Sequence, residues 1–341
     1  MSQHPETTRL APSPTGALHL GNARTFLVNW AMARRADWRI ILRLEDLDTP
    51  RIKPGAAAAL LDTLRWLGMD WDPDPDVPDQ GAGPGVLVQS ANIAAYTHEM
   101  RCLAGLGMAY PCHLSRTQVD AAASAPQEGA HETPYPASLR PPIAGQPLDF
   151  DFPPPGQGSA LGEGQRPNWR FCTPPGVVEF EDAFAGPQRI DPAATVGDFV
   201  LWTRRGQPSY QLAVVVDDNR QGVTQIVRGD DLLDSAARQL QIRRALDMEP
   251  EPTFTHLPLV LGPDGRRLAK RHGDTRIETY RAAGIPPEAV IGLVAFWCGV
   301  LPRRKRLSAP EFRAGLDLST IKRSPITFTD EDDQWLRSQS R

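Results

Sequence analysis

Hydrophobic residues along the first hundred positions alternate between the two periods that identify strands and helices. Residues 8–13 predict a short strand that runs into a Pro/Gly loop, and residues 38–46 form the continuous apolar run typical of a buried parallel strand. Residues 19–35 and 55–68 have helical periodicity, with candidate core positions at Leu20, Phe26, Leu27, Trp30, Leu60, Leu61, Leu64 and Leu67. This alternation predicts an open α/β sheet, whose ligands gather at the carboxyl ends of the strands.

The middle of the chain lacks this periodicity. Residues 126–187 contain 13 prolines in 62 positions, which predicts a loop-rich insertion with short strands. A disordered tract is the alternative. The aromatic residues of this part favour packing over disorder, and they are Phe150, Phe152, Trp169, Phe171 and Phe180.

Regular patterns resume after the insertion. Residues 198–218 read as two strand-like runs joined by a turn at 205–207, and residues 223–229 as another strand. Residues 231–248 form an amphipathic helix, and residues 256–273 a strand, a Pro-Asp-Gly turn and a polar loop. Two further helices are predicted at 277–283 and 286–298.

Composition narrows the class of protein. The chain has 341 residues with 40% hydrophobic and 23% charged positions, and its 34 prolines and 28 glycines stay below the share of a low-complexity chain. No apolar run is long enough for a membrane span, and the N-terminus lacks the regions of a signal peptide. Four scattered cysteines indicate a reducing compartment. We therefore expect a cytoplasmic enzyme rather than a secreted, membrane or fibrous protein.

The net charge of −4 is unevenly distributed. Residues 261–341 carry 15 Lys/Arg against 10 Asp/Glu, a net +5, which leaves −9 for residues 1–260. The densest basic run is 303–306. It is either a solvated loop or a patch that contacts phosphates on an otherwise acidic body.

The first cluster of candidate binding residues lies between a predicted strand and a helix, at residues 11–22. A helix N-terminus offers unpaired N–H groups and the positive end of the helix dipole, which suits a phosphate. Gly21 would let a nucleotide approach the backbone closely, and His19 can donate a hydrogen bond to a phosphoryl oxygen.

The second cluster is the basic loop at residues 267–273, which follows the 263–265 turn. Lys270 on this glycine-flanked loop could swing over a triphosphate and neutralise the leaving pyrophosphate. A solvated basic loop is the alternative.

The third cluster consists of charges at predicted strand ends, where Arg9, Glu45 and Arg228 would converge on one edge of a parallel sheet with Tyr210 near them. Two guanidinium groups and one carboxylate match an amino acid with two carboxylates and one ammonium, which describes glutamate. Surface ion pairing is the alternative.

These motifs together resemble class I glutamyl-tRNA synthetases. Residues 11–25, 43–51, 210–233 and 268–274 are similar, in this order, to that family's HIGH signature, amino-acid pocket, second Rossmann half and KMSKS loop. The resemblance covers about residues 7–120 and 195–330. It implies a Rossmann catalytic core split into residues 1–108 and 196–273, an acceptor-binding-like insertion at 109–195, and a helical stem-contact segment at 274–341.

Two features resemble the truncated paralogues of that family, the glutamyl-Q tRNA(Asp) synthetases. The segment that resembles the stem-contact region lies at the end of the sequence, so we expect no anticodon-binding domain. Leu232 and Leu233 also stand where glutamyl-tRNA synthetases usually have a histidine. This resemblance implies tRNA-independent activation of L-glutamate by ATP with Mg²⁺, followed by transfer to queuosine in the anticodon stem-loop of tRNA(Asp).

The resemblance also implies roles for individual residues. Glutamate would be bound by Arg9, Ala11, Ser13, Glu45, Tyr210 and Arg228, with Glu45 on the ammonium group and the two arginines sharing the carboxylates. ATP would be held by His19, Gly21, Asn22 and Lys270. The KMSKS-like loop would comprise Arg267, Leu268, Ala269, Lys270 and Arg271.

A zinc site known in many of these paralogues is incomplete here. Of its Cys-x-Cys, Tyr and Cys pattern, this chain keeps Cys112 and Tyr135, while Leu114 and Ser138 replace two ligands. A set of Cys112, His113 and His131 is conceivable, but structural zinc needs four well-spaced ligands. We therefore expect no zinc.

Three other functions remain open at this point. The runner-up is a shortened glutamyl-tRNA synthetase that charges tRNA(Glu). A non-catalytic tRNA-binding paralogue and a small-molecule nucleotidyltransferase are the others. We take a monomer as the default state.

Overall fold

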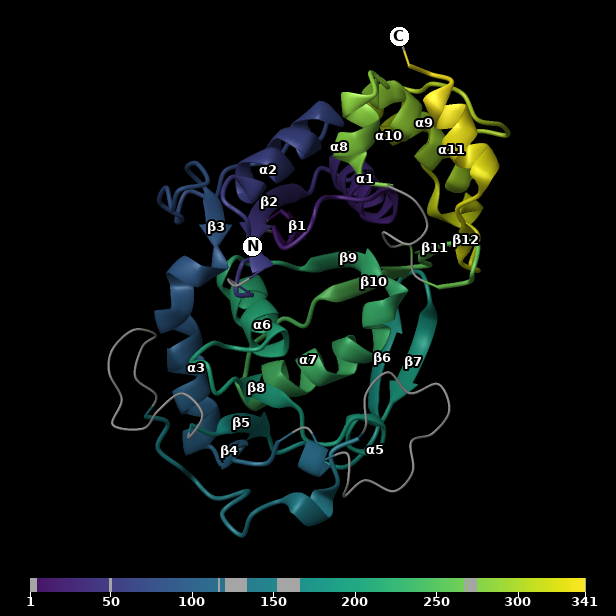
Figure 1. The fold of residues 1–341 in the computed structure, drawn as a ribbon. Helices are drawn as coiled ribbons and strands as arrows, with labels where there is room; N and C mark the ends of the chain where they lie inside the picture. Colours follow the sequence, from purple (N-terminus) through teal and green to yellow (C-terminus); the bar gives the residue numbers. More distant parts are fainter. Residues whose placement is uncertain are drawn as a thin grey trace.

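The protein is built on one central sheet (Figure 1), described by a computed structural model that covers residues 5–48, 51–115, 117–119, 134–151, 166–266, 268 and 275–340. Neighbouring strands pair in parallel, apart from an antiparallel hairpin at one edge. In spatial order the strands are β3 (Val86–Val88), β2 (Arg39–Leu44), β1 (Thr7–Leu10), β9 (Gln225–Gly229), β10 (Thr253–Leu257), β6 (Val178–Asp182) and β7 (Gly186–Ile190). The predicted α/β fold class is confirmed.

Helices cover both faces of this sheet (Figure 1). On one face lie α1 (Leu20–Arg35) and α2 (Ala56–Trp66), and on the other α6 (Tyr210–Arg220) and α7 (Leu233–Ala245). Strand β2 shows why both faces are apolar: Ile40 and Leu42 pack in the α1 cluster, whereas Ile41 packs in the α7 cluster. The predicted core positions are buried, except Phe26, which is only half-buried.

A second, three-stranded antiparallel sheet lies beside α3 (Ile93–Gly105) and consists of β4 (Ala109–Cys112), β5 (Asn168–Phe171) and β8 (Val200–Trp202). The proline-rich stretch supplies β5 to this sheet and the β6–β7 hairpin to the central one. Short helical turns connect these parts: η2 (Gln89–Asn92), η3 (Ala137–Leu139), α5 (Pro192–Thr195) and η5 (Asp230–Leu232).

The C-terminal part is helical and packs on the α1 side of the sheet, joining the same apolar cluster (Figure 1). It comprises α8 (Ile277–Ala282), α9 (Pro287–Trp297), α10 (Ala309–Gly315), η7 (Leu318–Thr320) and α11 (Asp330–Arg337), with β11 (Val260–Leu261) paired to β12 (Ile326–Thr327). The helices predicted at 277–283 and 286–298 are confirmed. Within the described ranges, no helix is both long and apolar enough to cross a bilayer.

Two predictions of secondary structure are wrong. The run at 210–218 is helix α6, not a strand. Residues Leu212 to Asp218 are all buried, and a helix that is buried on every side lacks the polar face that reveals its period. The single strand predicted from His256 is also divided between β10 and β11, in two different sheets, with Pro258 between them.

The proline-rich stretch is held to the second sheet by aromatic packing. Phe150 lies edge-on to Trp169 at 5.1 Å and to Trp202 at 5.2 Å between ring centroids, and is 3% exposed. Phe150→Ala should lower the free energy of unfolding by about 3 to 5 kcal/mol, because it removes this packing and leaves a cavity. Urea unfolding measures the loss, with the 59%-exposed Leu106→Ala as a near-neutral control. An equal effect of both substitutions would contradict this packing.

Candidate active site

The carboxyl ends of three neighbouring strands bring the predicted site residues together. Arg9 lies on β1, Arg228 on β9, and Glu45 directly after β2. These three side chains line a cavity of about 300 Å³. Of the predicted residues, this cavity is lined by Arg9, Ala11, His19, Gly21, Asn22, Glu45, Tyr210 and Arg228.

The remaining predicted residues are placed differently. Ser13 is exposed and does not line the cavity, and its Oγ lies 3.1 Å from Thr15 Oγ1. Leu268 is buried, at 2% exposure. The other members of the basic loop, Arg267, Ala269, Lys270 and Arg271, lie outside the described residues.

One side of the cavity is the N-terminus of α1. His19 is the N-cap residue, and its Nδ1 accepts a hydrogen bond from the backbone N–H of Asn22 at 3.4 Å. A Cβ atom at Gly21 would lie 3.2 Å from the His19 ring and 3.6 Å from Val260, so glycine here gives the imidazole its room. The arrangement offers the positive end of a 16-residue helix to the cavity, which suits an anion.

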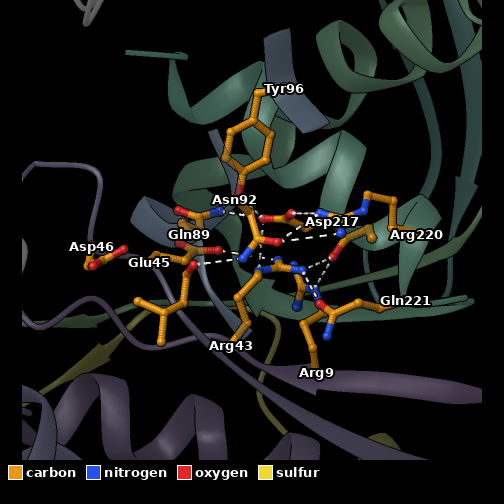
Figure 2. Close-up of polar contacts among 12 residues, drawn as sticks. Arg9, Arg43, Glu45, Asp46, Gln89, Asn92, Tyr96, Asp217, Arg220 and Gln221 are labelled. Carbon is orange, nitrogen blue, oxygen red and sulfur yellow. Dashed lines mark hydrogen bonds and ion pairs between the residues drawn. The ribbon is translucent and has the colours of Figure 1, made fainter. Parts of the chain in front are cut away.

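Behind the wall formed by the strand ends, Arg9 is tied into a buried ionic network (Figure 2). Its Nε donates to Asp218 Oδ1 at 3.2 Å, and Arg43 Nη1 donates to the same oxygen at 2.7 Å. Both arginines and Asp218 are at most 5% exposed. Burial acts to raise the pKa of Asp218, but the charges of Arg43 and Arg9 outweigh it and the pKa is lowered. Asp218 therefore stays ionised between the two guanidinium groups.

The same network reaches Glu45 in the cavity wall. Arg43 Nη2 donates to Glu45 Oε1 at 3.3 Å. Burial raises the pKa of Glu45, while the charges of Arg43 and Arg9 act in the opposite direction. A cation that enters the cavity beside Glu45 would relieve the cost of keeping this carboxylate charged.

A second buried carboxylate, Asp217, lies 3.9 Å from Arg43 Nε (Figure 2). Its Oδ2 accepts hydrogen bonds from Gln89 Nε2 at 2.8 Å and Tyr96 Oη at 3.0 Å. Burial raises the pKa of Asp217 to about 6 against the pull of Arg43. Arg43 is fully buried; burial lowers its pKa, but Asp218, Glu45 and Asp217 outweigh that and raise it.

Arg228 is held differently, by acceptors behind the cavity. Its Nε donates to His256 Nε2 at 2.9 Å, its Nη1 to Gln239 Oε1 at 2.8 Å, and its Nη2 to the Leu232 carbonyl at 3.2 Å. Its guanidinium carbon also lies 5.3 Å from the centre of the Phe254 ring. Burial lowers the pKa of Arg228. These contacts fix the orientation of the guanidinium.

The sequence prediction missed the residues behind the cavity, although signals for some of them were present. Arg43 interrupts an apolar strand, and a charge inside such a run needs buried partners. Asp217 and Asp218 end an apolar run in the same way. Nothing in the pattern marks Gln239 or His256 as partners of Arg228.

The two residual positions of the zinc pattern contact each other. Cys112 Sγ lies 3.6 Å from Tyr135 Oη, and Tyr135 donates its hydroxyl proton to the Leu139 carbonyl at 3.0 Å. The Cys112 thiol is therefore the donor to Tyr135. Among the described residues no group of three or more His, Cys, Asp or Glu side chains could hold a metal ion. His113 is exposed, and His131 lies outside the described residues.

Removing the positive charge of the buried Arg43 should destabilise the protein strongly. Arg43→Met leaves Asp217 and Asp218 buried without their main counter-charge, which should cost about 3 to 5 kcal/mol of unfolding free energy in a urea titration. Arg51→Met is the matched control, because Arg51 is 76% exposed in its pair with Asp48 and should contribute less than about 1 kcal/mol. Equal losses in the two variants would show that the network does not depend on Arg43.

Comparisons with known proteins agree with this geometry. Residues 6–306 match the family model described as tRNA synthetases class I (E and Q), catalytic domain. A glutamyl-Q tRNA(Asp) synthetase from Symbiobacterium thermophilum is 44% identical over 95% of this chain and 96% of its own length. A glutamate–tRNA ligase from Azoarcus sp. is 37% identical over 99% of this chain and 68% of its own length.

A solved structure supports the same assignment. The crystal structure of a glutamate tRNA ligase from Elizabethkingia meningosepticum, in complex with its amino acid, has a TM-score of 0.75 at 28% identity. The match covers 98% of this chain and 69% of that one. The chain therefore belongs to the class I tRNA synthetases of the E and Q family, in the branch of the glutamyl-Q tRNA(Asp) synthetases.

Proposed function

We propose that this enzyme activates L-glutamate with ATP, without tRNA, and transfers the glutamate to queuosine in the anticodon stem-loop of tRNA(Asp). The observation that carries the proposal is the single cavity wall on which Arg9, Glu45 and Arg228 meet beside the N-terminus of α1. A dicarboxylic amino acid and a triphosphate are the two ligands that these two walls suit.

Charge matching supports glutamate as the amino acid. Glu45 is the acceptor for the substrate ammonium, and Arg9 and Arg228 are the partners of its two carboxylates. The Nε of each arginine is already engaged, with Asp218 and His256 respectively, so both guanidinium groups are oriented before the substrate arrives. Tyr210, the first residue of α6, and Ala11 complete this side of the cavity. The exposed Ser13 is the least supported of the proposed glutamate contacts.

The nucleotide side of the proposal rests on α1. His19, Gly21 and Asn22 at its first turn would contact the phosphates of ATP, which binds with Mg²⁺ as a substrate. Lys270 and its neighbours in the KMSKS-like loop would stabilise the charge that develops as pyrophosphate leaves. We also propose that the enzyme acts as a monomer.

The acceptor is proposed from the relatives. The identity of 44% across nearly the whole glutamyl-Q tRNA(Asp) synthetase exceeds the 37% across two thirds of the glutamate–tRNA ligase. A shortened glutamyl-tRNA synthetase is the second candidate, since it would use the same cavity for the same amino acid.

Pyrophosphate exchange separates these candidates. With glutamate and ATP, the purified enzyme should exchange labelled pyrophosphate into ATP with no RNA present. Glutamine should be worse by about 10⁴-fold in kcat/KM, because its amide leaves a buried cation unpaired. Exchange that appears only with tRNA(Glu) would favour the second candidate. Labelled glutamate should then attach to tRNA(Asp) that contains queuosine and not to the same tRNA without it.

Lys270→Ala should lower the kcat of exchange by about 10²-fold or more, because a cation beside the leaving pyrophosphate acts mainly in the transition state. The KM for glutamate should change little. The exposed Lys322→Ala is the matched control for loss of a lysine charge, and should behave as wild type in this tRNA-free assay. Unchanged exchange in Lys270→Ala would mean that the 267–271 loop does not act on ATP.

A further inference from the structure

A hydrogen-bonded chain runs across three neighbouring strands and ends at Arg228 in the cavity wall. Asp182 ends β6, His256 lies on β10, and Arg228 lies on β9, in register with His256. Asp182 Oδ2 lies 2.6 Å from His256 Nδ1, and His256 Nε2 lies 2.9 Å from Arg228 Nε. The side chains of Asp182 and His256 are completely buried.

Hydrogen-bond chemistry assigns the protons along this chain. An arginine Nε–H can only donate, so His256 Nε2 must accept and carries no proton. His256 Nδ1 then carries the proton and donates it to Asp182. Burial lowers the pKa of His256, although the hydrogen bond to Asp182 acts in the opposite direction. The imidazole is thus neutral, in the tautomer that Asp182 selects.

The hydrogen-bond partners of Arg228 also determine how its positive charge is compensated. In the described part of the chain, the acceptors of Arg228 are an imidazole nitrogen, the Gln239 amide, the Leu232 carbonyl and the Tyr210 hydroxyl, all of them neutral. Arg9 is different, because Asp218 already gives it a carboxylate partner. Within the described ranges, the protein therefore orients Arg228 without placing a carboxylate in direct contact with it, although the charge of Asp218 acts on it from a distance.

We propose that Asp182 and His256 are positioning residues, which turn Arg228 toward the cavity as a cation reserved for a carboxylate of the substrate. The proposal rests on the proposed function in taking this carboxylate to be that of glutamate. A guanidinium that is held by neutral acceptors gains a counter-ion when the acid binds and gains none from the neutral amide of glutamine.

Asp182→Asn tests the proposal with a change of one atom. Asp182 Oδ1 accepts from the backbone N–H groups of Phe184 at 2.9 Å and Ala185 at 2.6 Å, so the amide oxygen of asparagine must take that place. The NH₂ group then faces His256 Nδ1 and donates to it. The imidazole proton then moves to Nε2, where it faces the Nε–H of Arg228, so that two donors oppose each other. The protonated Nε2 also competes with Arg228 Nη2 for the Leu232 carbonyl.

The expected result is a rise in the KM for glutamate of at least about tenfold in pyrophosphate exchange, with the KM for ATP nearly unchanged. Asp198→Asn is the matched control, because Asp198 is equally buried and also accepts backbone and side-chain hydrogen bonds, but from Thr173, Tyr110 and Arg140 rather than from His256. Its KM for glutamate should stay within about twofold of wild type. An unchanged glutamate KM in folded Asp182→Asn overturns the proposal.

A double-mutant cycle distinguishes tautomer control from a general structural role. In His256→Gln the glutamine oxygen can still accept from Arg228, but no tautomer is left to control. Adding Asp182→Asn should then raise the KM for glutamate little further, whereas additive effects overturn the proposal.

Wild-type protein labelled with ¹⁵N-histidine gives a test that does not depend on activity. One of the seven histidines should show a protonated Nδ1 and an unprotonated Nε2, with its signal lost in His256→Gln. A protonated Nε2 on His256 overturns the proposal. Absence of glutamate-dependent exchange in the wild type would instead refute the proposed function. The tautomer measurement would still test the hydrogen-bonded chain of Asp182, His256 and Arg228.

Discussion

The structure of this site depends on a cation buried in the central sheet. Arg43 has no exposed surface, and an unpaired charge in that position would be prohibitively costly. Its partners come from α6, which contributes Asp217 and Asp218, and from the end of its own strand, which contributes Glu45. Because Asp218 also binds Arg9 on the neighbouring strand, the need to neutralise Arg43 fixes the strand ends that carry Arg9 and Glu45 relative to each other. The relative placement of β1, β2 and α6 at the site therefore has an electrostatic cause.

The two arginines of the cavity then have unequal electrostatic environments. Arg9 shares a carboxylate with Arg43, whereas Arg228 is oriented by a neutral imidazole, an amide, a carbonyl and the Tyr210 hydroxyl. Proximity of Arg9 and burial both make the charge of Arg228 more costly in the absence of substrate. A ligand with two carboxylates relieves that cost and an amide does not, so selectivity for the acid follows from how each guanidinium is held as well as from its presence.

The sequence predicts the charged residues that line the cavity but not the buried residues that hold them. Arg9, Glu45 and Arg228 could be placed together because each ends a recognisable strand of a parallel sheet, where position follows from topology. The partner of Arg43 lies 175 residues away on α6, a helix whose buried, β-branched run imitates a strand. His256 and Asp182 meet because β10 and β6 are neighbours, and no local pattern reveals that pairing. The KMSKS-like loop stays a prediction, because it lies largely outside the described residues.

Buried aspartates also explain how a proline-rich stretch with little periodicity can be ordered. Asp198 is 1% exposed and accepts from Tyr110 Oη at 2.5 Å, from Arg140 at 2.6 Å and from the Thr173 backbone at 2.9 Å. These donors come from three separate segments, so one carboxylate joins parts of the chain that no helix or strand pattern connects. Asp182 and Asp218 join distant segments in the same way. Each of these carboxylates accepts several hydrogen bonds at once. Long-range polar contacts therefore order this part of the chain, whereas the packing of apolar faces orders the amphipathic helices.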